Sequence, residues 1–376
     1  MNPTIQEKAL AFAREQIAPV AKDLDQEYQF PKEIFEKLGE EGFFTLLIPK
    51  EQGGLGLGLF EHEEVVRTFA KASASVGLCY MMHNVALNTV LNAGSDDLKA
   101  EIIDAVVNKH QFLALAYSES GTGTHFYLPE TKADHHDGQV TLKGRKSMVT
   151  SAQNAQFYLV LSEGEEEDVI DNWVVSKDDA GVEFIPEWWH GLGMHSNVSC
   201  PMDLKNVTLD YKYRLGEPGS GLNQVLMYVA PMFITGLAAV YTGLGEHIQD
   251  IAIAHAQDRK YPDGTMLAEI DTVKLHLSNI YSNVFASIEA TKAAAQAGAQ
   301  GDEDALAKII AARIIASENV IESGRLAMRV GGGRAYNAYG DFAWLLRDTY
   351  AGQIMAPSVD VLHQWLGQAV TGQQVP

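Results

Sequence analysis

The sequence predicts an α+β protein in which a β-rich segment separates two helical ones. Apolar residues recur at spacings of three and four on both sides of the chain's middle, which is the period of an amphipathic helix. Between about residues 111 and 215 the apolar runs become short and rich in β-branched residues. The 376 residues therefore divide into an N-terminal helical domain (1–110), a middle β domain (111–216) and a C-terminal helical bundle (217–376).

The N-terminal domain is predicted to be helical throughout. Helical spacing is clearest in four segments, 5–24, 31–41, 60–72 and 75–91. Pro31 opens the second segment, where its missing N–H costs nothing. The glycines at 53, 54 and 56 predict a loop between the second and third segments.

Short strands are predicted next, because β-branched and apolar residues gather in brief runs. These runs lie at 112–116, 140–142, 147–150, 157–161, 172–175 and 207–209. Asp137-Gly138 is a two-residue hairpin pattern. The acidic segment 163–168 is expected to form a solvated hairpin tip.

The C-terminal domain predicts long helices over 223–257, 267–297 and 302–329, followed by shorter ones over 342–347 and 359–369. Pro231 should kink the first of these helices or delay its start. The three glycines at 331–333 should end the third long helix.

Composition limits the partners and the compartment. With 28 Lys and Arg against 49 Asp and Glu, the formal charge is −21, which argues against binding to nucleic acid or an anionic membrane. No window approaches the ~20 apolar residues of a membrane span. The N-terminus lacks the apolar core of a signal peptide, so we expect a cytoplasmic protein. Cys79 and Cys200 follow no metal-ligand spacing, so we expect both to be buried thiols and predict no metal site.

Two glycine- and hydroxyl-rich segments mark the middle domain, LAYSESGTGTH at 115–125 and GRKSMVTSA at 144–152. The first follows the apolar run 112–116, so it is typical of a strand that opens into a loop. Glycines let a backbone approach a flat ligand, and hydroxyls and free amides suit carbonyls or phosphates. Alternation along the second segment puts Met148 and Thr150 on one face. Together the segments predict a surface for a ring such as a flavin.

These motifs resemble those of the acyl-CoA dehydrogenase superfamily of flavoproteins, which read roughly TEPGAGSD and GEKxWITNG. Here the corresponding residues are SESGTGTH and GRKSMVTSA. Further stretches follow in family order: IPKEQGGLGLG at 48–58, HGLGMHSNVSCPMDLKNVTL at 190–209, GGGRAY at 331–336 and LLRD at 345–348. The resemblance implies the family's fold, with an N-terminal helical domain, a middle β domain and a C-terminal helical bundle.

The resemblance also implies FAD, and it assigns residues to the cofactor and the substrate. Met148 replaces a tryptophan over the ring, His195 replaces an arginine, and Arg329 replaces a glutamine. Residues matching family positions near the flavin are Leu115, Tyr117, Ser118, Met148, Thr150 and Ser358. Those matching positions that reach the pyrophosphate or adenosine of a neighbouring subunit's FAD are Arg259, Arg329, Gly332 and Gly333, and Thr124 matches a substrate-binding serine.

The catalytic base of the family has no counterpart in this sequence. Ala356 occupies the position of the usual glutamate, and the alternative position on the first long C-terminal helix falls at about Phe233. Asp360, one helical turn past Ala356, is a candidate substitute, although it also suits a helix start. Glu119 lies within the flavin motif, where a structural role is expected. His83 and His363 have no assigned role.

Three functions therefore stay open. The first is α,β-dehydrogenation of an acyl thioester, carried by CoA or a carrier protein, with an electron-transfer flavoprotein or similar acceptor reoxidising the flavin. The second is a flavin-dependent monooxygenase or oxidase, which requires no α-proton base. The third is a non-catalytic flavin-binding subunit. Because the implied FAD site spans subunits, we expect a homotetramer or homodimer.

Overall fold

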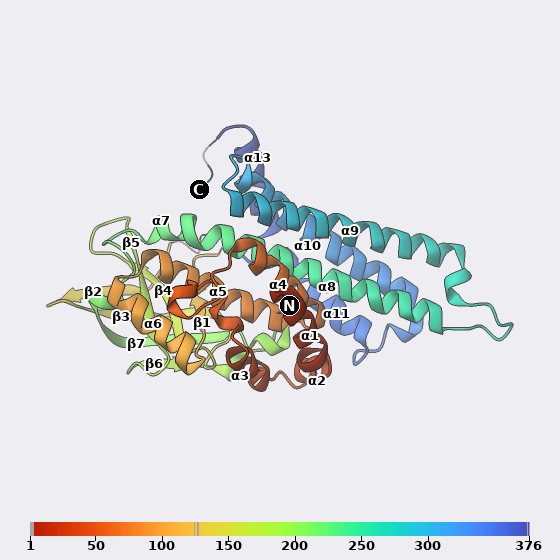
Figure 1. Cartoon of the computed structure of the whole chain (residues 1–376), viewed down its shortest axis with the longest axis horizontal. Coiled ribbons are helices and arrows are strands. Elements are labelled where there is room, and N and C mark those ends of the chain that lie inside the picture. Colours follow the sequence, from red (N-terminus) through yellow and green to blue (C-terminus); the bar gives the residue numbers. More distant parts are fainter. Residues whose placement is uncertain (1–3, 124, 126–127, 374, 376) are drawn as a thin grey trace.

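The computed structural model describes residues 4–123, 125, 128–373 and 375. It shows a β-rich part at one end of the molecule and a long helical bundle that extends to the other end (Figure 1). The N-terminal helices are α1 (Ile5–Phe12), α2 (Ala21–Gln26), α3 (Lys32–Glu40), α4 (Leu59–Ala72), α5 (Ala74–Ala93) and α6 (Asp96–Lys109).

Two features of the N-terminal domain differ from the prediction. The helix expected over 5–24 is broken, because a π-helical segment, Ala13–Ile17, follows α1 and a turn containing Pro19 precedes α2. Proline lacks the N–H that a continuous helix needs at this point. Helix α6 was not among the four expected segments. Its N-cap is Ser95, whose side chain accepts a hydrogen bond from the Leu98 N–H.

The middle domain consists of two sheets. The three-stranded sheet has the order β1 (Leu113–Ala116), β4 (Phe157–Glu163), β5 (Ile170–Ser176), with β1 parallel to β4 and β5 antiparallel to it. The four-stranded sheet is antiparallel and has the order β2 (Lys132–His136), β3 (Gln139–Val149), β7 (Cys200–Asp210), β6 (Val182–Phe184).

Most of the expected strands are confirmed, with changes in their extent. The runs at 140–142 and 147–150 belong to the single strand β3, and strands β2 and β6 were not expected. The Asp137-Gly138 hairpin is confirmed, because β2 and β3 pair directly and both residues have positive φ, 47° and 79°. The acidic segment is also an exposed hairpin tip, since Glu163 pairs with Ile170.

The C-terminal part is helical. Its elements are α7 (Gly221–Gln224), α8 (Ala230–Asp258), α9 (Asp271–Gln300), α10 (Ala305–Gly331), α11 (Asp341–Thr349), α12 (Ala351–Ile354) and α13 (Val359–Val370). Pro231 does not delay the helix, because helical backbone runs without a break from α7 into α8; the irregularity before Pro231 is a π-helical segment, Val225–Val229. The Tyr228 carbonyl accepts a hydrogen bond of 2.9 Å from Nδ2 of Asn88 on α5.

The segment from α7 through α8 is more apolar than the sequence analysis recognised. Residues Gly221–Asp258 are long and apolar enough to cross a membrane by length and composition alone. However, 67% of the most apolar stretch is buried against the rest of the chain, and the core helix of a globular protein meets the same criterion. We therefore describe α8 as the central helix of the bundle.

The two histidines without an assigned role are accounted for by their contacts. Nδ1 of His83 accepts a hydrogen bond from the Leu113 N–H at the start of β1, and Nε2 lies 2.8 Å from the Phe44 carbonyl. Burial lowers the pKa of His83 to about 4, so this buried ring is neutral and structural. His363 lies on the exposed surface beside Glu318. Cys79 and Cys200 are free and buried, as predicted.

We predict that Gly54→Ala destabilises the protein. A Cβ at this position would overlap the backbone carbonyl and Cβ of Ile48, neither of which can move aside as a flexible side chain would. Overpacking of this kind costs roughly 1–3 kcal/mol. The matched control is Gly367→Ala in exposed α13, where a Cβ meets nothing within 4 Å. That change should leave the free energy of unfolding unchanged or raise it by up to ~1 kcal/mol. Denaturant unfolding of both variants checks the difference, and equal stabilities would contradict it.

Candidate functional site

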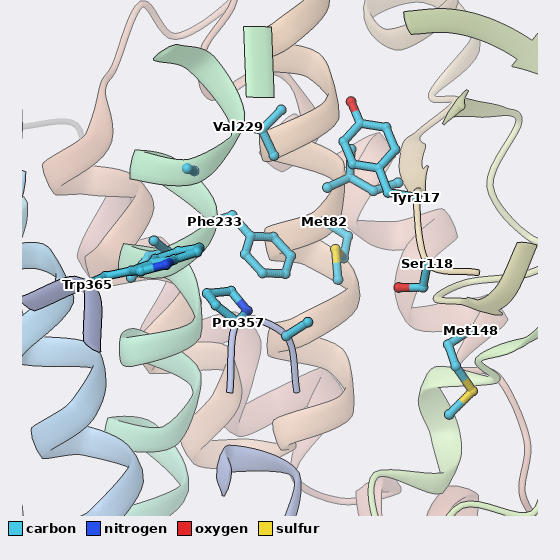
Figure 2. Close-up of a pocket in the computed structure, with 12 residues that line it drawn as sticks. Met82, Tyr117, Ser118, Met148, Val229, Phe233, Pro357 and Trp365 are labelled. Carbon is cyan, nitrogen blue, oxygen red and sulfur yellow. The ribbon is translucent and has the colours of Figure 1, made fainter. Parts of the chain in front are cut away.

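A cavity of about 70 Å³ lies where the middle β domain meets the C-terminal helices. Figure 2 shows the side chains converging on it from β1, β3, α5, the start of α8 and the segment before α13. The lining residues are Met82, Leu115, Tyr117, Ser118, Met148, Val229, Ala230, Phe233, Ile234, Ala356, Pro357 and Trp365.

The middle-domain wall contains four of the residues predicted to contact a flavin, Leu115, Tyr117, Ser118 and Met148. Strands β1 and β3 bring them together, because the Ser147 N–H donates a hydrogen bond of 2.8 Å to the Ser118 carbonyl. The Ser118 hydroxyl points across the cavity, whereas the Tyr117 hydroxyl points away from it (Figure 2). The phenol oxygen accepts a hydrogen bond of 2.9 Å from Nδ2 of Asn172. This wall therefore offers one hydroxyl on an otherwise apolar surface.

A buried ion pair fixes the loop behind that wall. The Glu119 carboxylate accepts hydrogen bonds from Nζ of Lys146 and, at 2.6 Å, from Oγ1 of Thr131. Lys146 is fully buried and also donates to the Leu161 carbonyl at 2.6 Å. Burial lowers the pKa of Lys146 to about 8, while the charge of Glu119 opposes that shift. These contacts give Glu119 the structural role that was expected for it.

The opposite wall comes from the C-terminal domain and is apolar. Val229, Phe233 and Ile234 project from the π-helical segment and the first turns of α8, and Trp365 projects from α13. Ala356 also lines the cavity, so both positions at which the family carries its base face this space without a carboxylate. Among the described residues, no ionisable acid, histidine or basic side chain lines the cavity. Asp360 is exposed on α13 and does not reach the lining.

Thr150 is buried just beyond the lining. Its hydroxyl lies 3.2 Å from that of Ser199, which donates a hydrogen bond of 2.9 Å to Oδ1 of Asn197. The adjoining backbone is strained, with φ of 59° at Ser151 and 45° at the β-branched Val198. Strain of this kind gathers at functional sites and persists only where the surroundings enforce it.

Two other predicted residues, Ser358 and Thr124, add no contact to the description of the cavity. Ser358 is the half-buried N-cap of α13, but its side chain makes no capping hydrogen bond. Thr124, the predicted substrate contact, lies outside the described residues.

The residues assigned to the pyrophosphate and adenosine lie at the far end of the bundle (Figure 1). Helix α8 has 29 residues, so at about 1.5 Å per residue it separates Arg259 from the cavity by roughly 40 Å. Gly332 has a positive φ of 55°, and a Cβ there would lie 3.9 Å from Nη1 of Arg259. No ion pair occupies Arg259 or Arg329 in the part of the chain that the structure describes.

Positive charge is concentrated at this end of the bundle, as the lowered pKa values of two histidines indicate. Burial, followed by the charges of Arg259 and Arg334, lowers the pKa of His255. Burial, followed by the charges of Arg329 and Arg325, lowers the pKa of His276. We call these four arginines, Arg259, Arg325, Arg329 and Arg334, the cationic cluster. In a chain of net charge −21, such a cluster suits an anionic pyrophosphate.

The residues present fit FAD, provided that two copies of the chain share it. The apolar cavity wall with the Ser118 hydroxyl and the half-exposed Met148 thioether suits a planar ring. The guanidinium groups suit a pyrophosphate, but one FAD cannot span the roughly 40 Å between the two places along α8. A chain whose cavity holds the ring therefore cannot place its own Arg259 at the pyrophosphate of that FAD, which agrees with the expectation that Arg259 reaches a neighbouring subunit's FAD.

Sequence reasoning assigned no place in a site to three of the cavity residues, namely Met82, Pro357 and Trp365. Met82 belongs to α5, which is buried on nearly all sides, so periodicity gives it no special direction. No sequence pattern marks Trp365 as part of a site.

Sequence models of three protein domains match most of the chain. They are described as the acyl-CoA dehydrogenase N-terminal domain (residues 3–110), middle domain (114–207) and C-terminal domain (224–370). Together they span both walls of the cavity and the cationic cluster.

Individual proteins agree with this match. The mitochondrial isovaleryl-CoA dehydrogenase of Oryza sativa subsp. japonica is 26% identical over 365 residues, covering 95% of this chain and 88% of the relative. The 3-(aryl)acrylate reductase of Clostridium sporogenes is 28% identical over 342 residues, covering 88% of each. The structure of butyryl-CoA dehydrogenase from Megasphaera elsdenii superposes with a TM-score of 0.91 at 20% identity, covering 99% of each chain. This chain therefore belongs to the acyl-CoA dehydrogenase family of FAD-dependent oxidoreductases that act on CH–CH groups.

Proposed function

We propose that this protein desaturates an apolar acyl thioester between its α and β carbons, with the acyl group carried by CoA or a carrier protein. The observation that carries this proposal is the cavity itself. It places four predicted flavin contacts opposite Ala356, Phe233 and Trp365, so an acyl chain would lie between the ring and an apolar wall. An electron-transfer flavoprotein or similar acceptor then removes the electrons.

The side chains of this site would bind and orient the substrate. Phe233, Ile234 and Trp365 provide an apolar surface that favours an uncharged acyl group and disfavours a carboxylate or an ammonium. Ser118 supplies a hydroxyl that can donate one hydrogen bond. When bound, FAD accepts the hydride that leaves the β carbon.

The uncharged lining limits the proton-transfer half of this reaction. A positioned general base contributes typically ~10²–10⁴-fold to the rate, and among the described residues that line this cavity there is no carboxylate, histidine or amine to act as one. We therefore propose that the preferred substrate carries an aryl or a second electron-withdrawing group that acidifies its α-proton, and that solvent water accepts this proton. Simple saturated acyl groups should react slowly.

The same observation favours one alternative. A flavin monooxygenase or oxidase needs no α-proton base, so an uncharged cavity does not hinder it. Rapid reaction of the reduced holoprotein with oxygen, without bleaching by any thioester, would favour this alternative. A holoprotein that does neither would be the non-catalytic flavin-binding subunit.

We predict that Ala356→Glu creates a faster dehydrogenase. The new carboxylate would face the cavity at the position of the family's base, and general-base catalysis should raise the rate of flavin bleaching by saturated acyl-CoAs by roughly 10²-fold. Anaerobic stopped-flow absorbance of the FAD-loaded variant measures this rate. The rate should fall at low pH, where the introduced carboxylate is protonated.

The matched control is Asp360→Asn in the wild-type and Ala356→Glu backgrounds. Asp360 is exposed and outside the lining, so its removal should change neither rate by more than about twofold. Loss of wild-type bleaching in this control would identify Asp360 as the base and overturn our account of an uncharged site.

We also propose that the protein is a homodimer or homotetramer. Helix α9 exposes large apolar side chains, Leu275, Tyr281 and Phe285, with 60%, 59% and 57% of each accessible in the isolated chain. Tyr281 and Phe285 are one turn apart on the same face. A second copy covering this helix would also explain how the cationic cluster can reach another chain's FAD.

Phe285→Glu should therefore shift the protein to a smaller species, because a carboxylate in a buried apolar interface costs several kcal/mol unless it is paired. Size-exclusion chromatography with light scattering measures the mass, and absorbance of the same peak measures bound FAD, which should fall with it. Leu10→Glu on α1, where the native side chain is 54% exposed, is the control and should change neither. An unaltered mass in the Phe285 variant would remove α9 from the interface.

A further inference from the structure

His195 has an unusual hydrogen-bond environment, in which both ring nitrogens face acceptors. Nδ1 lies 3.0 Å from the Asp25 carbonyl oxygen and 3.3 Å from the Asp25 carboxylate. Nε2 lies 3.2 Å from the Leu192 carbonyl oxygen. A neutral imidazole has only one N–H, whereas an imidazolium has two. Only the charged ring satisfies both contacts, and at 5% exposure His195 cannot turn to water instead.

The charges around His195 come from two neighbouring elements. Asp25 lies on α2 and is 2% exposed, and Arg347 on α11 contacts the same carboxylate at 3.2 Å. Asp348, also on α11 and 1% exposed, accepts a hydrogen bond of 2.5 Å from the Met194 N–H. The Tyr28 ring stacks on the imidazole with 3.8 Å between centroids. These are the titratable and charged groups that face His195 among the described residues.

One end of the loop that carries His195 is fixed at this junction. The His195 N–H donates a hydrogen bond of 3.1 Å to Oδ1 of Asp25. Gly193 packs so closely on α11 that a Cβ there would overlap the backbone of Arg347. The loop of the middle domain thus contacts both the N-terminal and the C-terminal helical domains.

The other end of the loop braces Thr150. The Asn197 carbonyl accepts a hydrogen bond of 2.9 Å from the Ser151 N–H, and Ser199 contacts the Thr150 hydroxyl at 3.2 Å. Because the backbone at Val198 is in the left-handed region, this geometry depends on restraint from both ends. Loss of the His195 contacts would release the restraint at one end.

We propose that His195 is a positioning residue: in its imidazolium form it fixes the Met194–Ser199 loop between α2 and α11, and through that loop it sets the Thr150 hydroxyl beside the flavin cavity. The positioning of Thr150 rests on the proposed function, because Thr150 matters only if a cofactor occupies the cavity. The charge state of His195 and the order of the loop do not depend on that function.

This arrangement makes the loop sensitive to pH. Burial alone would lower the pKa of His195, but its hydrogen bond to Asp25 and the charge of that carboxylate outweigh burial, so the pKa is raised. The stabilisation is therefore fully present below the ordinary histidine value of about 6.5 and is lost as pH rises through the raised value. Burial and the charge of Asp25 also raise the pKa of Asp348, so its ionisation weakens the junction in the same direction.

The experiment compares hydrogen exchange in peptides spanning 192–200 and 149–155 for the wild type, His195→Arg and His195→Gln. At about pH 6 the wild type and the arginine variant should be equally protected. As pH rises from about 6 through the raised pKa of His195, the wild type should lose protection about tenfold relative to the arginine variant, because only arginine keeps its charge. The glutamine variant should resemble the high-pH wild type throughout. Ratios between variants at one pH cancel intrinsic exchange.

His363→Gln is the matched control, because that exposed histidine pairs with Glu318 far from the loop in sequence and should leave the wild-type ratios unchanged. If His195→Arg does not fold, Asp25→Asn provides the second test and should move the loss of protection to lower pH. Ratios that do not change with pH would overturn the proposal.

Visible circular dichroism of bound oxidised FAD completes the test. It should change with pH in the wild type and stay constant in the arginine variant. If the protein binds no FAD, the proposed function fails while the exchange data still test His195. If FAD binds and the exchange ratios stay flat, His195 fails while the proposed function stands.

Discussion

The site depends most on the burial of α8 along its length. Its first turns form the apolar wall of the cavity, and its C-terminal end presents Arg259 roughly 40 Å away. Because α8 keeps these two ends apart, the Arg259 of one chain cannot reach an FAD whose ring lies in that chain's own cavity. Under the proposed assembly, Arg259 would instead meet the FAD of a second copy, and assembly would then contribute to cofactor binding.

Charge is distributed in a consistent way around that helix. Among the described residues the cavity lining contains no charged side chain, yet buried ion pairs lie directly behind its supports, Lys146 with Glu119 and His195 with Asp25. A buried charge requires a partner and several hydrogen bonds, which these groups have. Such pairs rigidify the loops that carry Ser118 and Thr150, while the reacting space stays apolar. Because the charged groups lie behind the cavity wall, the wall keeps a fixed shape even though none of the described lining residues is a base.

The order of helical and β segments could be read from the sequence because hydrophobic periodicity is local. The Asp137-Gly138 hairpin could be read for the same reason, since it follows from the chemistry of two residues. The wall formed by Leu115, Tyr117, Ser118 and Met148 was also found, because it lies on two consecutive motifs. Met82 and Trp365 were not, since they reach the cavity only through packing between distant helices.

Packing between distant segments cannot be read from sequence, and for this reason the sequence did not show whether Asp360 faces the cavity. Sequence spacing made Asp360 a reasonable candidate, because it lies one turn beyond Ala356, but spacing cannot say which way α13 faces. In the fold, Trp365 from this helix lines the cavity while Asp360 faces outward. An acid at the start of a helix is stabilised by the helix dipole, so Asp360 has a structural role that does not require catalysis. With both family positions apolar and this acid exposed, the proposed dehydrogenation would pass the α-proton to solvent water, so a substrate whose α-proton is acidic would react fastest.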